Sequence, residues 1–219
     1  MIEDSAINEK IREIKKELRL AMNGVVSSIQ RNHGLNYKIN FGVEIPRIKG
    51  IAGKFEKNEE LAKRLWQDNI RECKMLAIFL MPENGYGAVA DKWIQEVRFT
   101  EIADQLAMHL LCRLPEAWEK ALQWIEKEEG LYGYCGFLTI SHLVRRNERP
   151  SAEQEQTFFN SIIAIDRQEG QGVTARCALN TLTNYLDRFQ DATARLKKTM
   201  ADKDYHPGWL TSLAESFDI

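Results

Sequence analysis

The sequence lacks the long apolar runs and the cysteine patterns of membrane and secreted proteins. Its N-terminus is charged from the third residue and never reaches the apolar stretch of a signal peptide or a membrane span. The four cysteines are widely separated, with no Cys-x-x-Cys pair and no histidine at zinc-ligand spacing: Cys73, Cys112, Cys135 and Cys177. We therefore expect a cytoplasmic protein with buried free thiols and no metal site.

The motifs of common enzyme classes are also missing. The sequence has no phosphate-binding Gly-rich loop, no H-E-x-x-H and no nucleophile elbow, so it implies no cofactor. The histidines are isolated and fit helix caps, surface positions or satisfied core positions: His33, His109, His142 and His206. Four tryptophans fall within amphipathic stretches, where they are expected to fill the space between helices: Trp66, Trp93, Trp118 and Trp124.

Positive charge is scarce for a protein that binds nucleic acid. The net charge is −2, whereas such proteins usually carry a basic domain or a basic stripe. Residues 1–80 hold 15 Lys and Arg against 11 Asp and Glu, and the whole chain holds 30 against 32, which leaves 15 against 21 for the remainder. This asymmetry is modest, but a groove can be locally basic while the whole molecule is acidic.

Helical periodicity is what the sequence has in abundance. Between residues 6 and 22, apolar side chains recur at intervals that place them on one helical face: Ile7, Ile11, Ile14, Leu18 and Met22. Helical segments then follow in pairs of about 35 to 40 residues, the period of HEAT-like arrays. We predict an all-α, HEAT-like helical-repeat solenoid, an α-α superhelix with a concave face, that forms a single domain over residues 1–219 with about six helix pairs.

Capping signals locate several helix starts. Pro46 suits the first turn of a helix, Asn58 is a good N-cap, and Ser151 with Gln154 forms a capping box. The remaining pattern predicts helices near residues 25–33, 58–67, 69–82, 86–97, 99–113, 115–129, 131–146, 151–165, 173–189, 190–201 and 207–216. The strongest strand signal, LNYKINFGV, is short and leads into the helix that begins near Pro46.

Two long segments carry a family resemblance. FGVEIPRIKGIAGKF with LAKRLWQDNIRECKMLAIFLM, and VRFTEIADQLAMHLL with PEAWEKALQWIEKEEGLYGYCGFLTISHLV, resemble the AlkD-like DNA alkylation repair family, a family of HEAT-like repeat DNA glycosylases. The likeness extends more weakly through VTARCALNTLTNYL and so covers roughly residues 35–190. It implies a superhelix whose concave face holds duplex DNA and excises cationic N-alkylated purines without flipping the damaged base into a pocket.

The resemblance also implies a site, from which this sequence departs. Asp104 matches the family carboxylate, which stabilises positive charge on the sugar while aromatic faces hold the cationic nucleotide. The two family tryptophans fall on Thr100 and Asn180, and the family arginine falls on Tyr134, whereas a basic residue is kept at Arg176. Without the resemblance, Asp104 would be interpreted as an ordinary capping or ion-pairing residue.

Basic residues complete the expected DNA-binding surface. Candidates for phosphate contacts, equally compatible with a solvated helical surface, are Arg47, Lys49, Lys54, Arg71, Lys74, Arg145, Arg146 and Arg176. With catalytic Asp104, the expected DNA-binding set is Thr100, Tyr134, Arg145, Arg146, Arg176 and Asn180. One hypothesis is a monomeric DNA repair protein, either a glycosylase with an altered site or a non-catalytic binder of alkylated or distorted duplex DNA. The alternative is a HEAT-like protein-interaction scaffold without DNA activity.

Overall fold

A computed structural model of the chain describes residues 2–167, 172–203, 208 and 215–217. Within these ranges the secondary structure consists of α-helices, two short 3-10 helices and one isolated β-bridge. The α-helices are α1 (Ile2–Leu20), α2 (Gly24–Asn32), α3 (Ile45–Ala52), α4 (Glu59–Gln67), α5 (Arg71–Leu80), α6 (Tyr86–Glu96), α7 (Thr100–His109), α8 (Ala117–Ile125), α9 (Tyr132–Arg145), α10 (Ala152–Arg167), α11 (Val173–Arg188) and α12 (Ala192–Asp202). The 3-10 helices are η1 (Glu83–Gly85) and η2 (Leu111–Arg113).

The chain divides into two compact units, Met1–Val89 and Ala90–Ile219, and the division falls within α6. Each unit is a set of packed helices, as the all-α prediction requires. The expected helix at residues 207–216 lies largely outside the described residues. Among the described helices, none is both long and apolar enough to cross a bilayer. A single domain over 1–219 stays a prediction.

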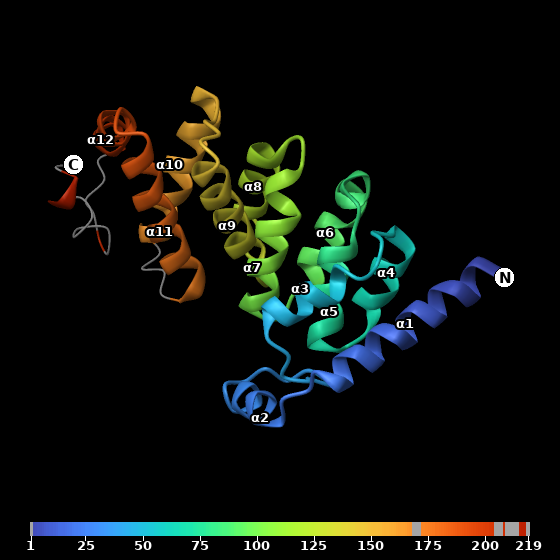
Figure 1. Ribbon diagram of the computed structural model, residues 1–219. Helices are drawn as coiled ribbons and strands as arrows, with labels where there is room; N and C mark the ends of the chain where they lie inside the picture. The colour runs from blue at the N-terminus through green and yellow to red at the C-terminus, as the bar shows by residue number, and fades with distance from the viewer. Residues whose placement is uncertain (1, 168–171, 204–207, 209–214, 218–219) are drawn as a thin grey trace. The chain divides into compact units, whose positions relative to one another are not determined.

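The first unit is built around α5, which packs against α3 and α4, while α1 packs against the same two helices (Figure 1). The predicted helix starts are confirmed here. Pro46 lies in the first turn of α3, and the Asn58 side chain accepts a hydrogen bond of 2.8 Å from the backbone N–H of Leu61. Ile14 and Leu18 of α1 are fully buried, as the helical periodicity predicted.

Met22 was placed wrongly on the buried face of α1. The helix ends at Leu20, two residues earlier, because the chain there turns toward α2, whose N-cap is Asn23. The Met22 side chain is therefore 62% exposed. The strand signal LNYKINFGV is reduced to a single parallel bridge between Ile39 and Ile70.

A buried charge pair organises the loop that precedes α3. The carboxylate of Glu72 accepts hydrogen bonds from the backbone N–H groups of Phe41 and Val43, at 3.1 and 3.2 Å. Arg71 donates to the carbonyl of Val43 at 2.8 Å and to Glu72 at 3.1 Å. Arg71 was a candidate for phosphate contact, but its side chain is almost fully buried in this clamp and serves the fold instead.

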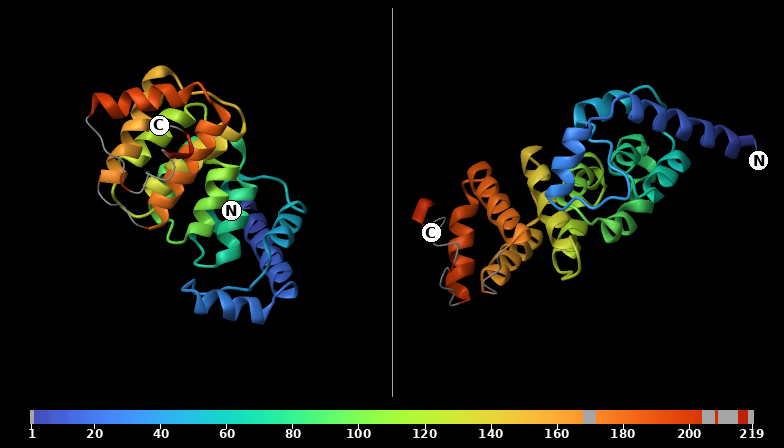
Figure 2. Two further views of the ribbon diagram at one scale, coloured as in Figure 1. Left: turned by 90° about the vertical axis from the view of Figure 1, so that its left-hand side faces the viewer. Right: turned by 90° about the horizontal axis from the view of Figure 1, so that it is seen from below.

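The second unit has two helical layers. Helix α9 packs against α7 on one side and α11 on the other, and α8 and α10 form the second layer behind them (Figures 1 and 2). Trp118 and Trp124 of α8 are buried in this unit, which confirms their predicted core role. The capping box of α10 is also confirmed, because the Ser151 and Gln154 side chains each accept a hydrogen bond from the other's backbone N–H.

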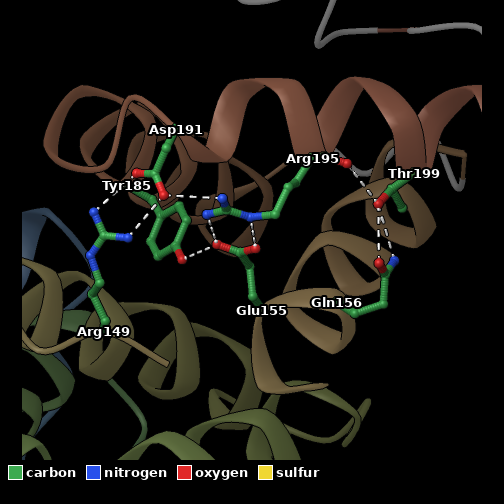
Figure 3. A network of polar contacts seen from close by, with 7 residues as sticks. All are labelled: Arg149, Glu155, Gln156, Tyr185, Asp191, Arg195 and Thr199. Carbon is green, nitrogen blue, oxygen red and sulfur yellow. Dashed lines mark hydrogen bonds and ion pairs between the residues drawn. The ribbon is translucent and has the colours of Figure 1, made fainter. Parts of the chain in front are cut away.

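Charged side chains fasten α12 to the preceding helices (Figure 3). Glu155 of α10 accepts hydrogen bonds from the Tyr185 hydroxyl at 2.5 Å and from Arg195 of α12 at 2.8 Å. Asp191 binds both Arg149 and Arg195 at 3.0 Å. Although burial opposes it, the hydrogen bonds from Arg195 and Tyr185 lower the pKa of Glu155, so this carboxylate stays ionised at neutral pH.

Candidate functional site

Five of the seven residues expected in the site line one pocket in the second unit. The pocket has a volume of about 380 Å³ and lies against α7, α9 and α11. Its lining consists of Thr100, Tyr134, Leu138, Ser141, Arg145, Val173, Arg176, Cys177, Asn180, Thr181 and Asn184. The residues that the family resemblance assigned to separate helix pairs therefore come together in space.

Helical spacing explains why these side chains converge. On α9 the lining residues Tyr134, Leu138, Ser141 and Arg145 are separated by four, three and four positions, which is one face of a helix. On α11 the lining residues also recur at three- and four-residue spacing, over three turns that begin at Val173. The resemblance did not point to Ser141 or Asn184, but their spacing from Arg145 and Asn180 was a signal available in the sequence.

Asp104 lies one helical turn after Thr100 on α7 and is hydrogen bonded across to α9. The Tyr134 hydroxyl donates to Asp104 Oδ1 at 3.0 Å. Burial raises the pKa of the Asp104 carboxyl, and the hydrogen bond from Tyr134 partly offsets that rise. Within the described part of the chain, Asp104 forms no ion pair, so neither the capping nor the ion-pairing interpretation describes it.

Two arginines give the pocket its positive charge. Arg145, at the end of α9, and Arg176, in the first turn of α11, are both exposed. Neither guanidinium forms an ion pair with any carboxylate of the described residues. A guanidinium presents a planar fork of donors that suits phosphate oxygens. The pocket can therefore bind an anion through its two positive charges and through several hydroxyl and amide groups.

Arg146 does not join this set. Its guanidinium donates to the backbone carbonyl of Cys112 at 2.8 Å and pairs with Glu148 at 2.8 Å, and it is not among the residues that line the pocket. Adjacent positions on a helix point about 100° apart, which is why Arg145 faces the pocket while Arg146 does not. The structure gives Arg146 a role in joining η2 to the end of α9.

The cysteines and histidines near the site are structural. All four cysteines are free and buried, as predicted, and burial raises the pKa of the pocket thiol Cys177 to about 12. A thiol of that kind stays protonated and is a poor nucleophile. Burial also lowers the pKa of His142 on α9, and His206 lies outside the described residues. The described residues contain no cluster of potential metal ligands.

Comparison with known proteins supports the all-α fold described above. A solved structure matches with a TM-score of 0.68 and 18% sequence identity, over 87% of this chain and 81% of that one. It is reported under the words "A new family of proteins related to the HEAT-like repeat DNA glycosylases with affinity for branched DNA structures". The predicted HEAT-like, all-α fold is thereby confirmed. A comparison with curated proteins finds no match.

A family model gives the assignment. The model described as "DNA alkylation repair enzyme" matches residues 14–166, which include α7, α9 and the Asp104–Tyr134 pair. That range covers more than half of the sequence. The chain therefore belongs to the DNA alkylation repair enzyme family.

Proposed function

We propose that this protein binds DNA through the pocket on α7, α9 and α11, and that binding, rather than base excision, is its principal activity. The observation that carries the proposal is the pair of arginines without ion-pair partners among the described residues, Arg145 of α9 and Arg176 of α11, which line the same pocket. Each guanidinium would neutralise a backbone phosphate. Thr100, Ser141 and Asn180 would supply hydrogen bonds to phosphate or sugar oxygens, contacts that position DNA without reading its sequence.

The state of Asp104 supports a binding role over excision. A carboxylate that stabilises a cationic sugar acts best when its charge is directed at the reacting centre. Here Oδ1 already accepts a hydrogen bond from Tyr134, which draws negative charge away from a substrate. In addition, Thr100 and Asn180 present no aromatic face to a cationic base. Excision of N-alkylated purines is the second candidate, favoured by the position of Asp104 beside the pocket-lining Thr100 and Tyr134.

The preferred DNA is proposed to be distorted or branched. The structural neighbour is reported to have affinity for branched DNA, and the family acts in alkylation repair. Two arginines and several short polar side chains suit a backbone of irregular path, because none of them depends on the base sequence. A regular duplex would be bound through the same charges but more weakly.

The experiment is a measurement of DNA affinity at several salt concentrations. We expect Arg145→Ala with Arg176→Ala to weaken binding about 100-fold and to reduce the slope of log affinity against log salt by roughly 2, because two phosphate contacts are lost. The matched control is Lys198→Ala with Lys203→Ala, which removes the same charge from exposed positions of α12 and its C-cap. Equal losses in both variants, or an unchanged salt slope, would contradict pocket binding.

Excision is tested separately on the same protein. Methylated duplex DNA is incubated with the wild type and with Asp104→Asn, and released purines are quantified. We expect no release above background from either protein, together with retained DNA binding by both. Release of purines that depends on Asp104 would contradict the proposal and show that the protein is a glycosylase. Absence of DNA binding at low salt would favour the protein-interaction scaffold.

A further inference from the structure

Helix α2 has its amphipathic character inverted. A surface helix normally buries its apolar side and exposes its polar side. In α2 the one buried residue is Ser27, whereas Val25 is 71% exposed and Ile29 is 49% exposed. Val25 and Ile29 are four positions apart and lie on the same face. The helix therefore presents its apolar face to solvent.

The segment that leads into α2 extends this apolar surface. Leu20 is 75% exposed and Met22 is 62% exposed. Together with Val25 and Ile29 they account for four of the seven large hydrophobic side chains that are exposed among the described residues. We refer to Leu20, Met22, Val25 and Ile29 as the α2 patch. Single exposed apolar residues are ordinary, but four within ten positions are a concentration that calls for an explanation.

The orientation of α2 is fixed by polar contacts on its opposite side. The Ser27 hydroxyl donates to the carbonyl of Asn40 at 2.7 Å, and Asn40 Nδ2 donates to Gln30 Oε1 at 2.8 Å. Gly42 lies directly against the helix at φ +68°, and a Cβ there would be 2.2 Å from the carbonyl oxygen of Asn23. These contacts hold the polar side of α2 against the loop, while the side chains of the α2 patch stay exposed to solvent.

The segment that contains the α2 patch carries charge of one sign. Residues 18–43 contain no Asp or Glu but contain the cations Arg19, Arg31 and Lys38, all of them exposed. The net charge of this segment is thus opposite to that of the whole chain, which is −2. Exposed Leu, Met, Val and Ile on a segment whose charged side chains are all cations match the chemistry of DNA, whose phosphates attract the cations and whose unstacked base faces take apolar wedges.

We infer that the α2 patch is a second DNA-binding surface, which places apolar side chains against unpaired or unstacked bases while the surrounding cations bind the backbone. This inference rests on the DNA binding proposed above and adds a second surface, which differs from the pocket in its chemistry and in its unit. Inserting a wedge into a regular duplex requires unstacking a base step, but bases at a junction are already partly unstacked. The α2 patch therefore confers preference for branched over continuous DNA.

The test replaces the apolar side chains without altering charge. The variant Leu20→Gln, Met22→Gln, Val25→Gln and Ile29→Gln keeps good helix formers at exposed positions, so unit 1 remains folded. Binding is measured to a three-way DNA junction and to a continuous duplex of the same length and sequence. We expect about a tenfold loss for the junction, less than about twofold for the duplex, and an unchanged salt slope, because base contacts and not phosphate contacts are lost.

A direct readout and a control complete the experiment. A 2-aminopurine placed at the junction should brighten when the wild type binds and should not change with the variant. Met108→Gln, which removes an exposed apolar side chain from α7, should leave both signals unaltered. The inference is overturned if the variant loses junction and duplex affinity equally or keeps both. It is also overturned if the variant keeps DNA binding but loses self-association in sedimentation, or adsorption to phosphatidylserine vesicles, since the surface would then serve a second copy or a membrane.

Discussion

The pocket of the second unit and the α2 patch of the first are made in opposite ways. The pocket is polar and carries Arg145 and Arg176, and its side chains come from three helices that pack on one another. The α2 patch is apolar, and its residues lie at the end of α1, in the turn that follows and on α2. Within the described residues, α2 has no extensive packing against another helix. Tertiary packing thus positions the first surface, and close contact between backbone segments positions the second.

The difference shows where helical patterning informs and where it misleads. In α9 and α11 a polar stripe among apolar residues leaves a hollow once the apolar faces have packed. In α2 the apolar residues would be assigned to the core, yet Asn40 and Gly42 hold the other side of the helix. Each surface should therefore be sensitive to a different kind of substitution.

The largest effect should come from Gly42→Ala, which removes the support of α2 and leaves the pocket intact. Alanine at φ +68° is strained, and its Cβ would collide with the backbone of Asn23. We expect the free energy of unfolding to fall by about 2 kcal/mol or more, measured by urea denaturation. The preference for branched DNA should fall with it.

A helical glycine provides the matched control for that substitution. A Cβ at Gly50 of α3 would meet nothing within 4 Å, and this residue is exposed. Gly50→Ala should raise stability by up to about 1 kcal/mol, because alanine is the better helix former. Similar losses from both variants would mean that the contact between α2 and the loop contributes little.

An intermediate effect is expected from Tyr134→Phe, which acts on the pocket alone. The hydrogen bond from Tyr134 lowers the pKa of Asp104, so its removal should raise that pKa further. When the folded pKa of a carboxyl lies above its unfolded pKa, the protein loses stability as pH rises between the two values. The higher pKa in the variant extends this pH range upward. We expect a loss of about 1 kcal/mol at neutral pH, measured by urea denaturation.

Carbon NMR of the Asp104 carboxyl group follows the pKa directly. The neighbouring Tyr132→Phe removes a hydrogen bond to the backbone carbonyl of Asp91 and serves as the control. It should reduce stability without moving the Asp104 titration. An Asp104 pKa that stays constant in Tyr134→Phe would show that the two side chains are not coupled.

The smallest expected effect is a loss of stability at α12 when the pH is lowered. The folded pKa of Glu155 is lowered, so its contribution to stability is present above its usual value of 4.5 and is lost as pH falls below that value. The effect should amount to about 0.5 kcal/mol after solvent screening, and hydrogen exchange of α12 amides should measure it. Glu155→Gln should abolish the pH dependence, whereas the exposed Glu153→Gln should preserve it.

Much of the fold followed from the sequence because helix signals are local. Asn58, Pro46 and the Ser151–Gln154 box each act within one turn, so the starts of α3, α4 and α10 were predicted from neighbouring residues. The prediction for Met22 was wrong because α1 ends at Leu20. The contacts of Gly42 with Asn23 and Ser27 at the start of α2 are non-local, so the sequence pattern did not reveal them.

The grouping of the candidate residues could be predicted from the sequence, whereas their hydrogen bonding could not, and their role stays a prediction. The family resemblance assigned Thr100, Tyr134 and Asn180 to one site, and the structure brings all three to one pocket. The hydrogen bond between Tyr134 and Asp104 joins side chains on two helices and depends on their packing distance. Likewise, helical spacing shows that Arg145 and Arg146 face different directions, but the sequence does not show that Arg146 binds the carbonyl of Cys112 on η2.

The buried pair of Arg71 and Glu72 connects the start of α2 to the core of its unit through the loop at residues 41–43. Glu72 holds the amides of Phe41 and Val43, and the residue between them, Gly42, bears on Asn23 and Ser27 at the start of α2. If a bound molecule displaces α2, the loop must move with it and change the hydrogen bonds to Glu72 on α5. Hydrogen exchange of the Phe41 and Val43 amide protons should therefore change when a molecule binds to the α2 patch.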